Sequence, residues 1–204
     1  MEGKEDSGPN APQRASHWRW RVMVMKPVPW QTGEICGPES AKSLTKPDVL
    51  KRDLSKAKKL LLIVGSEAPD EKHGKGDMVD YAIALSKAGK MDVIATGGAI
   101  KAFIEKGFEG AKTMGAMELA YRLQDPEWKG PHGRGPYDMI MIYGQPYYMQ
   151  WTMLSGVMNF APQIVPIALG RYFQPHAKWS FPNMKEKQYH TILDEILELV
   201  GGGK

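Results

Sequence analysis

The stretch LLLIVG, residues Leu60–Gly65, decides the fold, because five apolar residues follow one another without interruption and a glycine ends the run. A strand with one face in water alternates apolar and polar side chains, whereas a strand buried on both faces reads as a continuous apolar run. Parallel sheets are buried in this way because helices cover both of their faces. The stretch therefore predicts a strand inside a parallel sheet with helices on both sides.

Three further apolar runs follow along the chain, and a glycine ends each of them. They cover residues 91–96, 137–143 and 163–169, and the glycines are Gly97, Gly144 and Gly170. Apolar residues recur at helical spacing in residues 47–59, 77–87, 99–106, 116–123, 147–160 and 186–200. Strands that alternate with helices in this order predict an α/β fold with a doubly wound parallel sheet.

The 204 residues divide into an arm and one domain. Residues 1–40 predict an extended, aromatic and basic arm that is partly disordered when alone, and residues 41–204 predict a single α/β domain. The arm's tryptophans either pack back on this domain or dock on a partner. We expect docking, because Trp and Arg are enriched at interface hot spots. The residues predicted to bind the partner are Trp18, Trp20, Arg21 and Trp30.

Charge and cysteine content disfavour several classes of protein. Residues 1–60 contain 12 Lys+Arg against 7 Asp+Glu, whereas residues 61–204 contain 15 against 16. A body this close to neutral disfavours a nucleic-acid partner. The single cysteine, Cys36, forms no intrachain disulfide, cannot alone hold an iron–sulfur cluster, and is typical of a cytoplasmic protein. We expect no membrane partner and no secretory signal, because no apolar run reaches about 18 residues and the N-terminus is polar.

No pattern in the sequence predicts a catalytic group or a metal site. The five histidines lack helical ligand spacing and neighbouring carboxylates or thiols, so we expect them to be solvated or hydrogen-bonded structural residues. A nucleophile elbow is absent from the sequence, and the residues beside Cys36 supply no base that could activate its thiol. The sequence therefore predicts a chain that is not an enzyme by itself.

The glycines at the strand ends predict a candidate nucleotide site. Ligands of doubly wound sheets lie outside the carboxyl ends of the strands, and glycine lets the backbone approach them closely. The alternative is that these glycines only make turns, since neither a G-x-G-x-x-G run nor a Walker P-loop follows the first strand. The candidate cofactor-binding residues are Gly65, Ser66, Thr96, Gly97, Gly98, Gly144 and Gln145.

Several stretches resemble the epsilon subunit family of archaeal carbon monoxide dehydrogenase/acetyl-CoA decarbonylase-synthase complexes. They are Ser55–Gly65, Ser86–Ala88, Ile94–Gly97, the loop pattern D-P-x-W-x-G-x-x-G-x-G-x-Y-D over Asp125–Asp138, Tyr147–Tyr148, Asn159–Phe160, and S-F-x-N over Ser180–Asn183. The loop pattern is the most specific of them, because it stays in register with predicted strands on both sides. The resemblance covers about residues 45–200.

The resemblance implies a Rossmann-like domain related to the deoxyhypusine synthase-type NAD/FAD-binding fold. It also implies a cytoplasmic accessory subunit without catalytic residues, held by a nickel–iron–sulfur alpha subunit in an alpha2-epsilon2 assembly. Nickel and iron–sulfur clusters would then belong to the partner only. The alternative that the resemblance leaves open is a subunit that binds FAD and assists electron transfer during CO oxidation. Residues 1–40 are longer and more aromatic than the family pattern.

Overall fold

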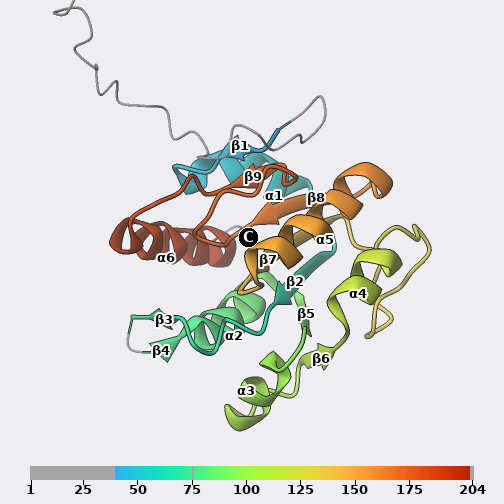
Figure 1. Ribbon diagram of the computed structural model, residues 1–204, viewed down its shortest axis with the longest axis horizontal. Helices are drawn as coiled ribbons and strands as arrows, with labels where there is room; N and C mark the ends of the chain where they lie inside the picture. Colours follow the sequence, from blue (N-terminus) through green and yellow to red (C-terminus); the bar gives the residue numbers. More distant parts are fainter. Residues whose placement is uncertain (1–39, 75, 203–204) are drawn as a thin grey trace, which may run out of the picture.

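The computed structural model describes residues 40–74 and 76–202. Within these residues, seven parallel strands form one sheet in the order β1-β9-β8-β7-β2-β5-β6 (Figure 1). The strands are β1 (Lys42–Ser43), β2 (Leu60–Val64), β5 (Asp92–Ala95), β6 (Ala111–Thr113), β7 (Met139–Tyr143), β8 (Val165–Ala168) and β9 (Trp179–Ser180). The doubly wound α/β fold is confirmed, while the arm residues Trp18, Trp20, Arg21 and Trp30 lie outside the described part.

The four predicted strands are the four central ones, β8, β7, β2 and β5. All five residues of β7 and the last four of β2 are buried, as the apolar runs predicted. Leu62 of β2 pairs with Met141 of β7 and with Val93 of β5. The LLLIV run therefore forms a strand in the middle of the sheet, with a neighbouring strand on each side.

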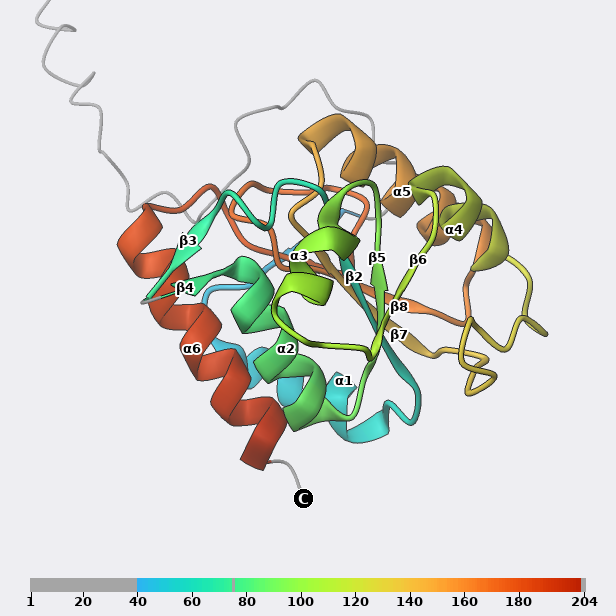
Figure 2. The ribbon, with the colours of Figure 1, turned by 90° about the horizontal axis from the view of Figure 1, so that it is seen from below.

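Helices cover both faces of the sheet (Figure 2), and each face has its own apolar core. Leu62 and Val64 of β2 point into one core, and Leu61 and Ile63 point into the other. The helices on the first side are the 3-10 helix η2 (Pro47–Leu50), α1 (Lys51–Lys56), α2 (Met78–Gly89), α3 (Ala99–Glu105) and α6 (Glu186–Gly202). Those on the second are α4 (Ala116–Arg122) and α5 (Tyr147–Phe160).

Five short strands were not predicted, and one predicted helix is divided. The strands β1, β6 and β9 add only two or three residues each at or next to the sheet edges, and β3 (Lys72–His73) pairs with β4 (Gly76–Asp77) in an antiparallel hairpin. The predicted helix over residues 47–59 was too long: it consists of η2 and α1 and ends at Lys56.

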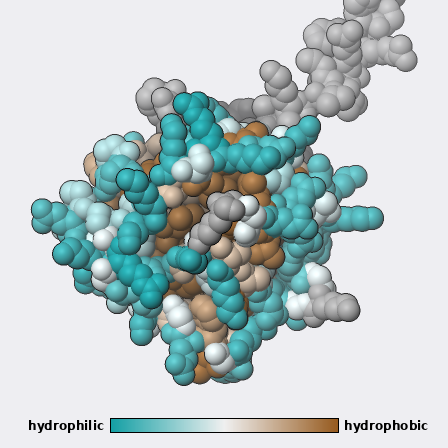
Figure 3. All heavy atoms as spheres, turned by 180° about the vertical axis from the view of Figure 1, so that it is seen from behind, coloured by the Kyte–Doolittle hydropathy of each residue, from teal (hydrophilic) through white to brown (hydrophobic). Residues whose placement is uncertain are grey.

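The face at the amino ends of the central strands carries α1 and the C-terminal turns of α2 and α6 (Figure 2). Seen from behind, apolar side chains gather in a hollow in the middle of the molecule and hydrophilic side chains surround them (Figure 3). The sheet therefore separates two different surfaces: the strand ends, where the candidate cofactor residues lie, and this opposite, apolar-centred face.

Candidate functional site

The strand order reverses between β2 and β7, which is where a doubly wound sheet offers a ligand crevice. Gly65 follows β2 and Gly144 follows β7, and a Cβ on Gly65 would overlap the backbone of Gly144. The N–H of Gly65 donates to the carbonyl of Tyr143 at 2.9 Å, and the N–H of Glu67 donates to the carbonyl of Gly144 at 2.8 Å. The two loops therefore bond to each other at the point where the strand order reverses.

The other candidate residues bond among themselves in the same way. The side-chain amide of Gln145 donates to the hydroxyl of Thr96, and both residues are buried. The position of a Cβ on Gly97 is 3.3 Å from Cβ of Ser66. Gly98 stands apart, because no atom of the described residues, beyond its chain neighbours, lies within 4 Å of its Cβ position. The structure thus brings six of the seven candidate residues together.

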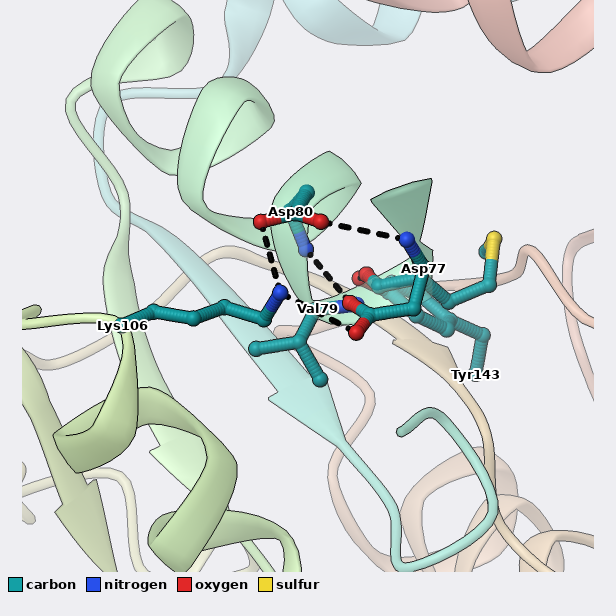
Figure 4. A network of polar contacts seen from close by, with 6 residues as sticks. Asp77, Val79, Asp80, Lys106 and Tyr143 are labelled. Carbon is teal, nitrogen blue, oxygen red and sulfur yellow. Dashed lines mark hydrogen bonds and ion pairs between the residues drawn. The ribbon is translucent and has the colours of Figure 1, made fainter. Parts of the chain in front are cut away.

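The N-terminus of α2 is capped by a carboxylate of the chain itself, that of Asp77 (Figure 4). The carboxylate of Asp77 accepts from the N–H of Val79 at 2.9 Å and of Asp80 at 3.1 Å, and Asp80 accepts from the N–H of Asp77 in return. Lys106 reaches both carboxylates at 3.0 and 2.9 Å, and its hydrogen bond lowers the pKa of Asp80. In dinucleotide-binding folds the phosphates lie at the helix after the first strand, and here that place is already occupied.

A cavity of about 520 Å³ opens beside this cluster, over the carboxyl ends of β7 and β8. Three carboxylates line it, those of Glu67, Asp70 and Glu71, together with one guanidinium, that of Arg171. Burial raises the pKa of Glu71, while Arg171 acts in the opposite direction. The excess of carboxylates makes this cavity unfavourable for a phosphate group.

Two buried amides on the wall of the cavity retain unused hydrogen-bonding capacity. Among the described residues, Nε2 of Gln150 and Oε1 of Gln174 have no hydrogen-bond partner, and both residues are buried. Nε2 of Gln174 donates to the carbonyl of Tyr147 at 3.3 Å. Buried polar groups are normally satisfied by protein or ordered water, so the cavity suits water or a small neutral polar molecule better than an anion.

One pair of histidines meets in a way that the sequence did not predict. Nε2 of His73 lies 2.8 Å from a carboxylate oxygen of Asp194, and the rings of His73 and His190 are 4.8 Å apart. Burial, with a smaller contribution from His73, lowers the pKa of His190. In the described part of the chain, no group of three or more His, Cys, Asp or Glu side chains is arranged to hold a metal ion. The pair joins the hairpin to α6.

A model of a known protein family matches most of the chain. A family model described as "CO dehydrogenase beta subunit/acetyl-CoA synthase epsilon subunit" matches residues 23–197. The chain belongs to this family. The match includes Trp30 of the arm and leaves out Trp18, Trp20 and Arg21.

Three archaeal relatives named as subunit epsilon of the acetyl-CoA decarbonylase/synthase complex are similar over most of their length. The one from Methanothrix soehngenii is 33% identical over 174 residues, 84% of this chain and 90% of the relative. The one from Archaeoglobus fulgidus is 35% identical over 158 residues, 75% of this chain and 82% of the relative. The one from Methanothermobacter thermautotrophicus is 29% identical over 169 residues, 83% of this chain and 94% of the relative. Among the described helices, none is long and apolar enough to cross a membrane.

Proposed function

We propose that this chain is a non-catalytic accessory subunit of the epsilon type. It binds and stabilises the nickel–iron–sulfur alpha subunit of a CO dehydrogenase/acetyl-CoA decarbonylase-synthase complex, with two copies of each, in the cytoplasm. The observation that carries the proposal is the family match over residues 23–197, together with relatives that are each named as a subunit of such a complex.

The geometry of the strand ends supports this proposal. Thr96 and Gln145 bond to each other, Gly65 packs on Gly144, and Asp77 caps α2. Groups that bond internally are available neither to a substrate nor to a cofactor phosphate. A role exerted through the outer surface of the domain is consistent with this arrangement.

Co-purification tests the proposal. The tagged chain and the alpha subunit are produced together without oxygen, purified through the tag and weighed by native mass spectrometry. We expect a complex with equal numbers of both subunits, and we expect the alpha subunit to lose CO-oxidising activity more slowly on heating when this chain is bound. A chain that elutes alone would contradict the proposal. Deleting residues 1–35 should weaken the affinity, and an unchanged affinity would remove only the predicted role of the arm.

The alternative proposal, an FAD-binding subunit that assists electron transfer, has one observation in its favour. The cavity of about 520 Å³ lies at the strand ends, next to Gly144 and Gln145. The residues present do not fit the pyrophosphate, however, because Glu67, Asp70 and Glu71 would face its negative charges and Asp77 fills the helix end. We therefore place this alternative second.

A flavin titration separates the two proposals. We expect FAD fluorescence to stay unchanged, apart from dilution, when the purified chain is added, because the carboxylates repel the phosphates. A saturable titration that Arg171→Ala weakens would support FAD binding instead. That variant suits the test because Arg171 lines the cavity and carries the guanidinium that a phosphate would contact.

A further inference from the structure

An apolar groove of about 360 Å³ lies on the face opposite the strand ends, between α1, the last turn of α2 and the last turns of α6. Its apolar lining consists of Leu54, Ala57, Leu60, Ala88, Leu199 and Val200. Helix α1 contains no fully buried residue, so Leu54 stays partly exposed although it packs against the core. Apolar side chains gather in a hollow on this face (Figure 3).

Lysines ring the groove, and none of the carboxylates in the described part of the chain lines it. The lysines are Lys51, Lys58 and Lys90. Among the described residues, Lys58 and Lys90 have no carboxylate within 4 Å, whereas Lys51 pairs with Asp48 at 2.8 Å on the open surface. The carboxylate of Asp138 accepts from the N–H groups of Lys58 and Lys59 at 2.8 and 3.0 Å. That contact fixes the turn and leaves the Lys58 ammonium group in solvent.

The backbone at Lys90 favours glycine, yet the chain has a lysine there. Lys90 follows the last turn of α2 with φ of 52°, and no other non-glycine among the described residues has a positive φ. Helices usually end in this conformation with glycine, and another residue costs on the order of 1 kcal/mol. Such strain persists at sites where the side chain is needed, so Lys90 points to a role for its charge at the rim.

The positive charge continues past Lys90 along the same face. A neighbouring hollow is lined by Lys87, Lys90, Lys112 and Arg134. Its two carboxylates are those of Glu109 and Asp92, and the buried Asp92 is already paired with Arg134 at 3.1 Å. On the other side, beyond Leu199, Glu195 and Glu198 line the next hollow. The cationic surface therefore extends from the groove past Lys90 and ends at Glu195 and Glu198 on the other side.

We infer that this lysine-ringed groove docks an acidic segment of the partner subunit, with an apolar side chain of that segment inserted between α1 and α6. This inference rests on the proposed function and names the surface through which it acts. An apolar centre within a charged rim is the usual anatomy of a protein interface. Charge complementarity then demands carboxylates on the partner.

The aromatic middle of the chain's own arm, residues 7–33, does not suit the groove, although Glu2, Glu5 and Asp6 make the tip of the arm acidic. Residues 7–33 contain Arg14, Arg19, Arg21 and Lys26 but no Asp or Glu, so the lysine ring would repel them. The aromatic arm and the groove therefore call for different contacts on the partner.

The first test is the double variant Lys58→Glu/Lys90→Glu in the full-length chain, with the affinity for the alpha subunit measured at low and high salt. We expect a loss of about 10-fold at low salt, with a weaker dependence on salt than the natural chain shows. The matched control is Lys101→Glu/Lys185→Glu, which makes the same change of charge at lysines outside the groove, and it should bind within about 3-fold. Equal affinities for the two double variants would overturn the inference. The proposed function would stand as long as the natural chain binds.

The second test identifies the occupant without disturbing the groove. A benzophenone amino acid replaces Ser55, an exposed residue at the groove edge, and the complex is irradiated. We expect attachment to a peptide of the partner that contains Asp or Glu next to an apolar residue. Attachment to this chain's own arm or to a second copy would overturn the inference. So would binding of the free chain to phosphatidylglycerol vesicles that is lost in Lys58→Glu/Lys90→Glu while that variant still binds the partner normally.

Discussion

The variant Gly65→Ala is expected to unfold at a Tm lower by roughly 6–12 °C, which corresponds to a loss of about 3 kcal/mol or more for a domain of this size. The added Cβ would overlap the carbonyl of Gly144 and the amide nitrogen of Gln145. These are backbone atoms beside two central strands, and the N–H of Gly65 already bonds to Tyr143. The strand ends would have to separate to admit one methyl group. Thermal unfolding followed by circular dichroism measures the fall.

The matched control is Gly98→Ala, which adds the same methyl group to another glycine of the candidate site. Beyond its chain neighbours, no atom of the described residues lies within 4 Å of that Cβ position, and φ of Gly98 is −78°, which alanine adopts readily. We expect its stability to stay within about 1 kcal/mol of the natural chain. Two variants of equal stability would contradict the prediction, because they would mean that the loops after β2 and β7 can part without cost.

The sequence predicts the centre of the sheet and misses its edges for a physical reason. The strands β2 and β7 have a neighbour on each side and helices on both faces, so almost every residue must be apolar. The edge strand β6 exposes Lys112 and Thr113, and β9 is only Trp179–Ser180. These segments become strands because their backbone pairs with an existing strand, and not because of a side-chain pattern. The hydrophobic periodicity of the sequence therefore does not reveal them.

The candidate site shows a similar division. Parallel strands end at one edge, so the sequence predicts that Gly65, Gly97 and Gly144 lie near one another, and the structure brings them together. The contact that closes the crevice depends on the path of irregular loops, which carry no periodic signal. The carboxylates of the cavity, including Glu71, lie in the irregular segment between β2 and α2.

The second large effect is a steep loss of stability above about pH 10, where an unfolded tyrosine loses its proton. Four buried tyrosines each donate their hydroxyl to an acceptor that cannot donate in return. The pairs are Tyr81 with the carbonyl of Leu193, Tyr137 with the carboxylate of Asp92, Tyr143 with the carbonyl of Met78, and Tyr189 with the carbonyl of Leu169. Burial is the largest cause that raises the pKa of each hydroxyl above its ordinary value.

The sign of the effect follows from proton counting. Below about pH 10 both the folded and the unfolded chain keep these protons, so the contribution to stability is complete and constant. Above it the unfolded chain releases protons that the folded chain retains, so the free energy of unfolding falls as pH rises. Each tyrosine contributes a slope of about 1.4 kcal/mol per pH unit, and four contribute about 5 kcal/mol per pH unit. A domain with a stability of about 5–15 kcal/mol then unfolds within roughly one to three pH units.

The variant Tyr143→Phe separates this effect from a general weakening of the fold. At neutral pH it should be less stable by about 1 kcal/mol, because the carbonyl of Met78 loses its donor. Above about pH 10 its stability should fall less steeply than that of the natural chain, by about 1.4 kcal/mol per pH unit. The matched control is Tyr121→Phe, which removes a hydroxyl from a residue that is 76% exposed, and it should leave the alkaline transition where it is. Denaturant unfolding at a series of pH values measures both slopes, and parallel slopes for Tyr143→Phe and the natural chain would show that the alkaline loss comes from groups other than Tyr143.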